Sequence, residues 1–300
     1  MNEKISVIIT TYGNRIDYLD KALRSVLNQT YRNTEIIIID DNGLSSINQL
    51  KVSKLLNNYN NKNIKYIPNK KNVGAQISRN LGLKEASGEF IAYLDDDDEW
   101  LLSKLEDQYN TFKNYKSENL GLVYCWYNEI TTRNNKVSSK LIKRKEYDDS
   151  FSFSMLLRSN YIGSTSFPLI KTSVLERLNG FDEEMMAQQD YELWLRISKE
   201  FSIKCINKPL CNYNSHKGER ITSNPHKKID SIEKIIKKYF IYYEKDPQAL
   251  SLKYKVLTIQ YLRAKELKTA LKYLWKNYKI KPFNLNITLS FIKNFLLIIR

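Results

Sequence analysis

Residues 35–42 read Glu-Ile-Ile-Ile-Ile-Asp-Asp-Asn, a run of four isoleucines that ends in two carboxylates and an amide. Continuous apolar runs of this length are typical of strands that are buried on both faces of a parallel sheet. A similar run precedes it at residues 6–9, and apolar side chains recur at helical spacing over residues 16–27. Because parallel strands need a crossover connection, this stretch predicts a strand–helix–strand unit.

The same alternation continues over the next hundred residues. Further strands are predicted at residues 64–67, 90–94 and 122–127, with helical stretches near 47–57, 75–86 and 100–116 between them. This order favours an α/β domain with a mostly parallel sheet and flanking helices. Ligands of such sheets bind beyond the carboxyl ends of the strands. We therefore expect one crevice lined by the polar residues that follow three strands: Thr10, Thr11, Tyr12, Asp40, Asp41, Asn42 and residues 95–98.

Charge divides the chain into two parts. The chain has 48 Lys and Arg against 33 Asp and Glu, a net charge of +15. Residues 1–216 hold 29 basic and 27 acidic side chains, whereas residues 217–300 hold 19 and 6. Amphipathic helical patterns fill residues 229–300 after a break at Asn224-Pro225. We therefore predict a nearly neutral domain at residues 1–216, a linker at 217–228 and a basic α-helical region at 229–300.

Composition excludes several classes of protein. A hydrophobic content of 42% excludes a wholly disordered chain. The three cysteines form no CxxC pair, which favours a reducing cytosol over a disulfide scaffold. Residues 1–15 lack the pattern of a signal peptide, and no 18 apolar residues run together. We therefore expect a cytoplasmic protein without a membrane span.

The four consecutive aspartates at residues 95–98 form the sharpest chemical motif. Adjacent carboxylates repel one another, so four of them directly after an apolar strand call for a cation. Side chains two residues apart on an extended segment point to the same side and could hold Mg²⁺ or Mn²⁺. The alternative is an acidic cluster whose negative charge interacts favourably with the dipole of the following helix.

Two further motifs have both a structural and a functional interpretation. Asp40 and Asp41 fit an Asx turn with a helix cap, or recognition of a base or ribose at a strand end. Arg79 lies one helical turn beyond the turn at Asn72–Gly74. It fits an ordinary surface arginine, or a guanidinium that faces a diphosphate.

In these motifs the sequence resembles glycosyltransferase family 2, whose members have the GT-A fold, a Rossmann-like arrangement. The motifs that carry the resemblance are spread in order over residues 5 to about 216: 6–12, 25–31, 35–42, 72–82, 92–100, 180–183 and 189–195. Members transfer a sugar from a nucleotide-sugar donor and invert the anomeric centre. The resemblance therefore implies a metal-dependent, inverting glycosyltransferase.

The resemblance also implies a role for each matched position. It places Thr10, Tyr12, Asp41 and Asp96 at the nucleotide, Arg79 at the diphosphate, Asp95, Asp97 and His216 at a Mn²⁺ or Mg²⁺ ion, Asp190 as the catalytic base, and Phe181, Asp182 and Trp194 at the acceptor. The aspartate run leaves the register of the metal ligands open by one residue, and His216 also fits a plain loop histidine. A metal and an arginine would stabilise the diphosphate leaving group, and a carboxylate would take the proton of the acceptor hydroxyl.

The resemblance does not extend to residues 229–300. Basic amphipathic helices favour binding to an anionic membrane surface, which suits transferases that act on lipid-linked glycans. The alternative is a solvated basic face, with the apolar tail docked on the catalytic domain or on another copy of the chain. We expect a UDP-linked donor, a glycan or lipid-linked acceptor in surface polysaccharide biosynthesis, and a peripheral location on the inner face of the cell membrane.

Two other functions compete with this interpretation. A sugar-phosphate nucleotidyltransferase would carry a glycine-rich loop near the N-terminus, but residues 10–15 contain one glycine and no GxG. A nucleic-acid-binding protein would fit the basic C-terminal region, but the sequence has no RNA-binding aromatic motif and no zinc-ligand spacing. We therefore expect no nucleic-acid partner.

Overall fold

The computed structural model describes residues 2–59, 61–117, 119–133, 136–215, 224–282 and 285–299. The first part of the chain forms β1 (Ile5–Thr11), α1 (Ile16–Leu27), β2 (Thr34–Asp40), α2 (Ile47–Asn57), β3 (Ile64–Pro68), α3 (Ala75–Glu85), β4 (Phe90–Asp95), β5 (Glu99–Trp100) and α4 (Lys104–Asn114). The middle part forms β6 (Leu120–Arg133), β7 (Lys136–Ile142), α5 (Asp149–Arg158), β8 (Leu169–Lys171), α6 (Thr172–Arg177), α7 (Gln189–Glu200) and β9 (Ser202–Ser215). The last part forms α8 (Pro225–Lys238), α9 (Phe240–Lys245), α10 (Pro247–Arg263), α11 (Leu267–Ile280) and α12 (Leu285–Ile299).

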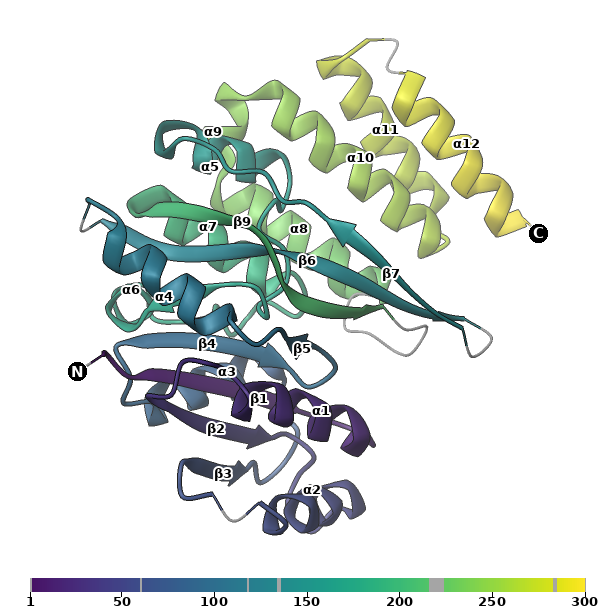
Figure 1. Ribbon diagram of the computed structural model, residues 1–300. Helices are drawn as coiled ribbons and strands as arrows, with labels where there is room; N and C mark the ends of the chain where they lie inside the picture. The colour runs from purple at the N-terminus through teal and green to yellow at the C-terminus, as the bar shows by residue number, and fades with distance from the viewer. Residues whose placement is uncertain are drawn as a thin grey trace.

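The described strands form one sheet in the order β3-β2-β1-β4-β8-β6-β9-β5, with β7 added to β6 (Figure 1). The four strands from β3 to β4 pair in parallel, joined by crossover helices. Beyond them, β8 pairs antiparallel with both β4 and β6, and β6 pairs in parallel with β9. The α/β class is confirmed, with the parallel pairing concentrated in the N-terminal half.

The predicted strands and helices of the first half are present with shifts of up to about four residues at their ends, except that β6 continues to Arg133, beyond the predicted end at residue 127. The aspartate run ends before β5, and α4 begins only at Lys104, with Glu106 and Asp107 as the acids of its first turn. The alternative that the run answers a helix dipole is therefore wrong, because the run lies outside the first turn of that helix. Strand β7 gave no apolar signal because nearly all of its residues are exposed.

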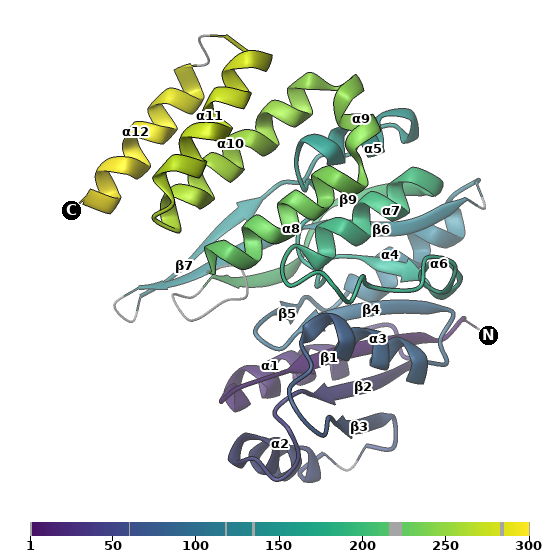
Figure 2. The same ribbon diagram turned by 180° about the vertical axis from the view of Figure 1, so that it is seen from behind.

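Alternating residues of the central strands build two hydrophobic cores, one on each face of the sheet. Val7 and Ile9 pack with α1, α2 and α4, whereas Ile8 packs with α5, α6 and α7 on the other face. Figure 2 shows α3, α7 and α8 covering this second face. Burial on both faces explains why these strands read as unbroken apolar runs.

The C-terminal helices complete the second core. Ile235 of α8, Tyr239 between α8 and α9, Tyr243 of α9 and Ala249 of α10 are buried among the side chains of α5 and α7. Arg158 of α5 also forms an ion pair with Asp246 at 2.9 Å. Because α8 to α10 pack directly on the sheet domain, the excess positive charge does not belong to a module that is tethered apart from it.

Helices α11 and α12 lie at the end of the molecule opposite to α2 and β3 (Figure 1). Helix α8 begins at Pro225, inside the linker that was predicted at 217–228, and residues 217–223 lie outside the described residues. The predicted helical pattern of residues 229–300 matches α8 to α12. Within the described residues, no helix combines the length and the apolar character needed to cross a bilayer.

Candidate active site

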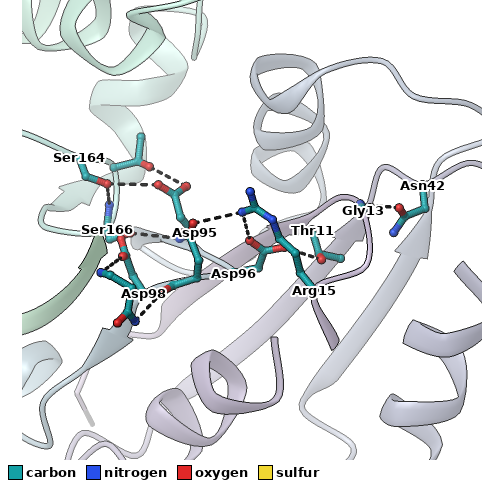
Figure 3. Close-up of polar contacts among 12 residues, drawn as sticks. Thr11, Gly13, Arg15, Asn42, Asp95, Asp96, Asp98, Ser164 and Ser166 are labelled. Carbon is teal, nitrogen blue, oxygen red and sulfur yellow. Dashed lines mark hydrogen bonds and ion pairs between the residues drawn. The ribbon is translucent and has the colours of Figure 1, made fainter. Parts of the chain in front are cut away.

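The parallel register brings the polar strand ends to one edge of the sheet. Thr10 of β1 lies opposite Asp95 of β4, and Thr11 lies opposite Asp40 of β2. Figure 3 shows the side chains of this edge, where the loop after β1 meets the aspartate run after β4. Residues about thirty to ninety positions apart in the sequence are thus neighbours, as the crossover topology requires.

Each carboxylate of the aspartate run has its own surroundings. Asp95 accepts hydrogen bonds from Arg79 at 2.7 Å, Thr165 at 3.1 Å and Ser164 at 3.2 Å. Ser164 and Thr165 belong to the segment between α5 and β8. Asp95 therefore ties the sheet edge to this segment and to α3.

Asp96 and Asp97 share one cation. The Nη1 atom of Arg15 lies 3.0 Å from Asp96 Oδ1 and 3.1 Å from Asp97 Oδ2. Thr11 donates a hydrogen bond of 2.6 Å to the other oxygen of Asp96. Burial raises the pKa of Asp96 to about 6, although Arg15 and Thr11 act in the opposite direction. The sequence alone assigned no role to Arg15, because its partners are about eighty residues away.

Asp98 is the last carboxylate of the run and the most deeply buried. Its side chain is fully buried, and Oδ1 accepts the backbone N–H of Asn214 at 3.1 Å. Burial, reinforced by the charges of Asp97 and Asp95, raises the pKa of Asp98 well above its usual range. The side-chain amide of Asn214 donates to Asp97 O at 2.7 Å, so the end of β9 is fastened to the run. His216 follows β9 but lies outside the described residues.

Two of these carboxylates fit a divalent cation. Among the described residues, no three His, Cys, Asp or Glu side chains group closely enough to hold a metal by themselves. Mg²⁺ does not require three, because it is commonly held by one or two carboxylates together with substrate phosphates and water. The oxygens of Asp96 and Asp97 that already share the Arg15 guanidinium form such a pair. In this structure Asp95 directs its oxygens to Arg79, Ser164 and Thr165 instead.

The carboxylate of Asp41, which follows β2, is hydrogen-bonded to the loop that follows β3. Its carboxylate accepts hydrogen bonds of 2.8 Å from Asn69 and from the backbone N–H groups of Val73 and Gly74. Gly74 has a φ of +96°, which favours glycine, and it stands directly before α3. Asp41 therefore holds the turn that positions the helix carrying Arg79. Tyr12, on the neighbouring loop, exposes 58% of its surface at the open side of this edge.

Arg79 joins the aspartate run to the candidate base. Its guanidinium donates to Asp95 at 2.7 Å and to Gln189 at 3.0 Å, and it lies 5.4 Å from the centre of the Phe181 ring. Asp190 follows Gln189 at the start of α7. The structure thus brings Arg79, Asp95 and the segment of Asp190 together.

Asp190 is half-buried and accepts a hydrogen bond of 3.4 Å from Asn160. Burial raises the pKa of Asp190 to about 6, with the Arg79 charge lowering it and the Asp95 charge raising it. A carboxylate with a pKa in this range can accept a proton from an acceptor hydroxyl near neutral pH.

The three predicted acceptor residues lie in different surroundings. Phe181 and Trp194 are buried, and the indole N–H of Trp194 donates to Gly163 O at 2.9 Å. In this structure they support the neighbouring segments rather than line an open surface. Asp182 is half-buried and forms an ion pair with Lys238 of α8 at 3.2 Å.

Helix α8 clamps the segment between Phe181 and Asp190. Lys238 reaches Asp182 and also the fully buried Glu192 at 2.6 Å. Lys234 donates to Glu184 O at 2.9 Å, and Ser231 accepts the backbone N–H of Ala187 at 3.0 Å. These contacts could not be predicted from the sequence, because in the sequence the lysines fit a solvated basic face of the helix.

Comparison with known proteins was made by sequence and by structure. Residues 6–178 match the model of the family described as glycosyl transferase family 2. The chain is 33% identical over 226 residues to WfgD of Escherichia coli, a UDP-Glc:alpha-D-GlcNAc-diphosphoundecaprenol beta-1,3-glucosyltransferase, covering 75% of this chain and 82% of WfgD. It is 30% identical over 272 residues to WcaA of Escherichia coli K12, named for colanic acid biosynthesis, covering 89% and 90%.

Other relatives are longer than this chain. The glycosyltransferase RC0461 of Rickettsia conorii is 33% identical over 226 residues, and this chain spans 35% of its length. The matches to glycosyltransferases support neither a nucleotidyltransferase nor a nucleic-acid-binding protein.

Solved structures share the fold. Staphylococcus aureus TarS in complex with UDP-GlcNAc superposes with a TM-score of 0.60 at 19% identity, covering 92% of this chain and 89% of that one. The mannosyltransferase PcManGT of Pyrobaculum calidifontis, in complex with GDP-Man and Mn²⁺, gives 0.60 at 15% identity, covering 99% and 86%. The GT-A arrangement expected from the sequence is therefore confirmed, including its helical C-terminal region.

Proposed function

Because the chain belongs to glycosyl transferase family 2, and is therefore a glycosyltransferase, we propose that it transfers a sugar from a UDP-linked donor to a lipid-linked acceptor with inversion. The observation that carries this proposal is the bridge made by Arg79. It connects Asp95, at the donor edge of the sheet, to Gln189 beside the candidate base Asp190. In this proposal the donor and the base lie on either side of one guanidinium.

We assign binding of the nucleotide-sugar donor to the exposed loops at the carboxyl ends of the parallel strands. Tyr12 offers an exposed ring for stacking on a base, with Thr10 at the end of the same strand. WfgD is named for a UDP-Glc donor, and TarS was solved with UDP-GlcNAc, which favours UDP. PcManGT was solved with GDP-Man, so GDP-linked sugars are the competing donors to be tested.

Asp96 and Asp97 are the residues that would hold Mn²⁺ or Mg²⁺. When bound, the metal would neutralise charge on the diphosphate leaving group. The protein's own contribution is to keep these two carboxylates together: Thr11 holds Asp96, and the Asn214 amide holds the backbone of Asp97.

Asp190 would act as the general base. The acceptor oxygen forms a bond to the anomeric carbon while the bond from that carbon to the diphosphate oxygen breaks, and the hydroxyl proton moves to Asp190. One displacement without a covalent intermediate inverts the anomeric centre. On the acceptor side, Phe181 would support Arg79, and Trp194 would support the segment around Gly163. Asp182 would contribute through its ion pair with Lys238, which fixes the start of the segment that leads to Asp190.

This mechanism is tested with the variant Asp190→Asn. We expect transfer to fall by about three orders of magnitude or more, within the range attributed to positioned acid–base groups, while UDP binding is kept. Glu200→Gln is the matched control, because Glu200 is an exposed carboxylate at the far end of the same helix. Transfer by Asp190→Asn within tenfold of the wild-type rate would refute the assignment of the base.

The acceptor class suggests where the enzyme acts. WfgD is named for a diphosphoundecaprenol acceptor, which resides in a membrane. Residues 267–300 of this chain contain seven basic and no acidic side chains, and α12 exposes an apolar row, Leu285, Leu289, Ile292 and Leu296. A basic helix pair with exposed apolar side chains suits an anionic lipid surface. We therefore propose peripheral attachment to the inner face of the cell membrane, in surface polysaccharide biosynthesis.

Membrane attachment is tested by co-sedimentation with phosphatidylglycerol vesicles and with phosphatidylcholine vesicles. We expect binding to the anionic vesicles only, and weaker binding for Leu289→Glu. Val137→Glu is the control, because Val137 is similarly exposed on β7, outside the helical region. Equal binding of wild type and Leu289→Glu would exclude α12 as the contact surface.

A further inference from the structure

Arg15 occupies the position where a metal would be expected. Its Nη1 atom lies 3.0 Å from Asp96 Oδ1 (Figure 3). The same atom lies 3.1 Å from Asp97 Oδ2. These are the two carboxylates that together fit a divalent cation. A guanidinium therefore satisfies the charge of the pair in the protein alone.

The backbone under Arg15 is anchored. Gly13 has a φ of +82° and donates its N–H to Asn42 Oδ1 at 2.7 Å, and Arg15 N donates to Gly13 O at 3.1 Å. On the adjacent loop residue, Asn14 Oδ1 accepts from Lys51 at 3.0 Å. The loop is therefore held in place from both sides.

The side chain of Arg15 is less confined than its partners. It is 31% exposed, whereas Asp96 and Asp97 are 5% and 17% exposed. Asp96 is also held by Thr11 at 2.6 Å, independently of Arg15. The guanidinium can therefore leave the carboxylates without a rearrangement of the loop or of the aspartate run.

A guanidinium and a divalent metal compete for this pair of oxygens. Both are drawn to the same negative charge, and like charges a few ångströms apart repel strongly outside bulk water. A diphosphate changes this balance, because it adds negative charge and further oxygen ligands for the metal. The free protein should therefore bind a metal weakly, and the complex with a nucleotide should bind it tightly.

We propose that Arg15 is a resident cation that holds the Asp96–Asp97 pair until a divalent metal and a nucleoside diphosphate arrive together. This rests on the metal dependence proposed above. Because coupling between two ligands is reciprocal, the metal should strengthen nucleotide binding by the same factor as the nucleotide strengthens metal binding. Arg15 thus makes the binding of donor and metal cooperative.

The test measures Mn²⁺ binding from the electron paramagnetic resonance signal of free Mn²⁺, with and without UDP. Association of Mn²⁺ with UDP alone is measured in protein-free samples and subtracted. The proteins are wild type, Arg15→Gln, Arg15→Lys and Arg24→Gln. Arg24 is the matched control, since it pairs with Asp20 on the exposed face of the same helix. Circular dichroism verifies that each variant is folded.

We expect Arg15→Gln to bind Mn²⁺ without UDP on the order of tenfold more tightly than wild type, a factor typical of coupled sites. The tightening caused by UDP should shrink by the same factor. Arg15→Lys, which keeps the charge, and Arg24→Gln should stay close to wild type.

Two outcomes would overturn the inference, and they differ in what else they affect. If Mn²⁺ binds in the presence of UDP but Arg15→Gln is no tighter than wild type without it, Arg15 is not the resident cation and the proposed metal dependence stands. If no protein binds Mn²⁺ with UDP, the metal dependence fails together with the inference. The transfer assay on Asp190→Asn then still decides the remainder of the proposed function.

Discussion

Two substitutions of Arg79 distinguish the contribution of its contact with Asp95 from that of its contact with Gln189. The geometry of each contact gives the expected loss of activity. The guanidinium donates to Asp95 at 2.7 Å and to Gln189 at 3.0 Å, and the side chain is 10% exposed. A lysine has one charged nitrogen, so Arg79→Lys can keep the ion pair with Asp95 but loses the contact with Gln189. Arg79→Gln loses the charge as well.

The lost contact with Gln189 is a hydrogen bond from a charged donor, worth about 2 kcal/mol. If that energy organises the segment of Asp190 for the transition state, kcat/KM of Arg79→Lys should fall about 30-fold, at 1.36 kcal/mol for each factor of ten. Arg79→Gln should lose more, on the order of 1000-fold, because the partly buried Asp95 then loses the arginine that forms its direct ion pair.

The assay is steady-state transfer from a UDP-sugar, with kcat and KM for the donor determined separately. We expect the loss in Arg79→Lys to lie mainly in kcat, because the ammonium still supplies a positive charge on the donor side. Arg24→Lys is the control, since its ion pair with Asp20 is on the surface. Rates of Arg79→Lys within threefold of wild type, or equal losses in both Arg79 variants, would refute the bridging role.

Three further results follow from the structure. Since Asp190 must be ionised to accept a proton and its pKa is about 6, kcat/KM should fall tenfold per pH unit below pH 6 and level off above it, which a pH–rate profile measures. Gly82→Ala would place a Cβ 2.5 Å from Ile8 Cγ2, so urea unfolding should show a loss of about 1–3 kcal/mol. Lys238→Met should destabilise the fold by only about 1 kcal/mol, because the buried Glu192 keeps Arg196 as a partner. It should also reduce kcat, because the segment between Phe181 and Asp190 loses its ion pair with α8. Unchanged thermal unfolding together with an unchanged kcat would contradict this.

The fold could be predicted for the part of the chain where local sequence carries the signal. The apolar runs of β1, β2 and β4 are unbroken because both faces of these strands are covered, and the crossover helices between them show helical spacing. Strands β5 and β7 escaped prediction for local reasons: β5 has two residues, and β7 is exposed and polar. Their pairing depends on β6 and β9, which are distant in the sequence.

The candidate site was predicted as a set of residue types, but not as a set of contacts. Asp95–Asp98, Arg79 and Asp190 were all named from the sequence, and the structure brings Arg79 between Asp95 and the segment of Asp190. The contacts of Arg15 with Asp96 and Asp97 could not be foreseen, because they cross about eighty residues of sequence. Asp41 was expected at the nucleotide, and here its hydrogen bonds hold the turn before α3.

The sequence by itself determined the parallel part of the sheet and the family, and it predicted the edge at which a ligand would bind, because periodicity and short motifs are local properties of the chain. Tertiary structure alone decided which carboxylates share a cation, since that depends on how the strands and loops meet at the sheet edge. It also decided the place of the C-terminal charge. Lys238, one of the basic residues that set residues 217–300 apart in composition, pairs with Asp182 and the buried Glu192 of the sheet domain. Ile235 of α8, Tyr243 of α9 and Ala249 of α10 are buried in the core on the second face of the sheet, because the apolar face of an amphipathic helix is stabilised by leaving water.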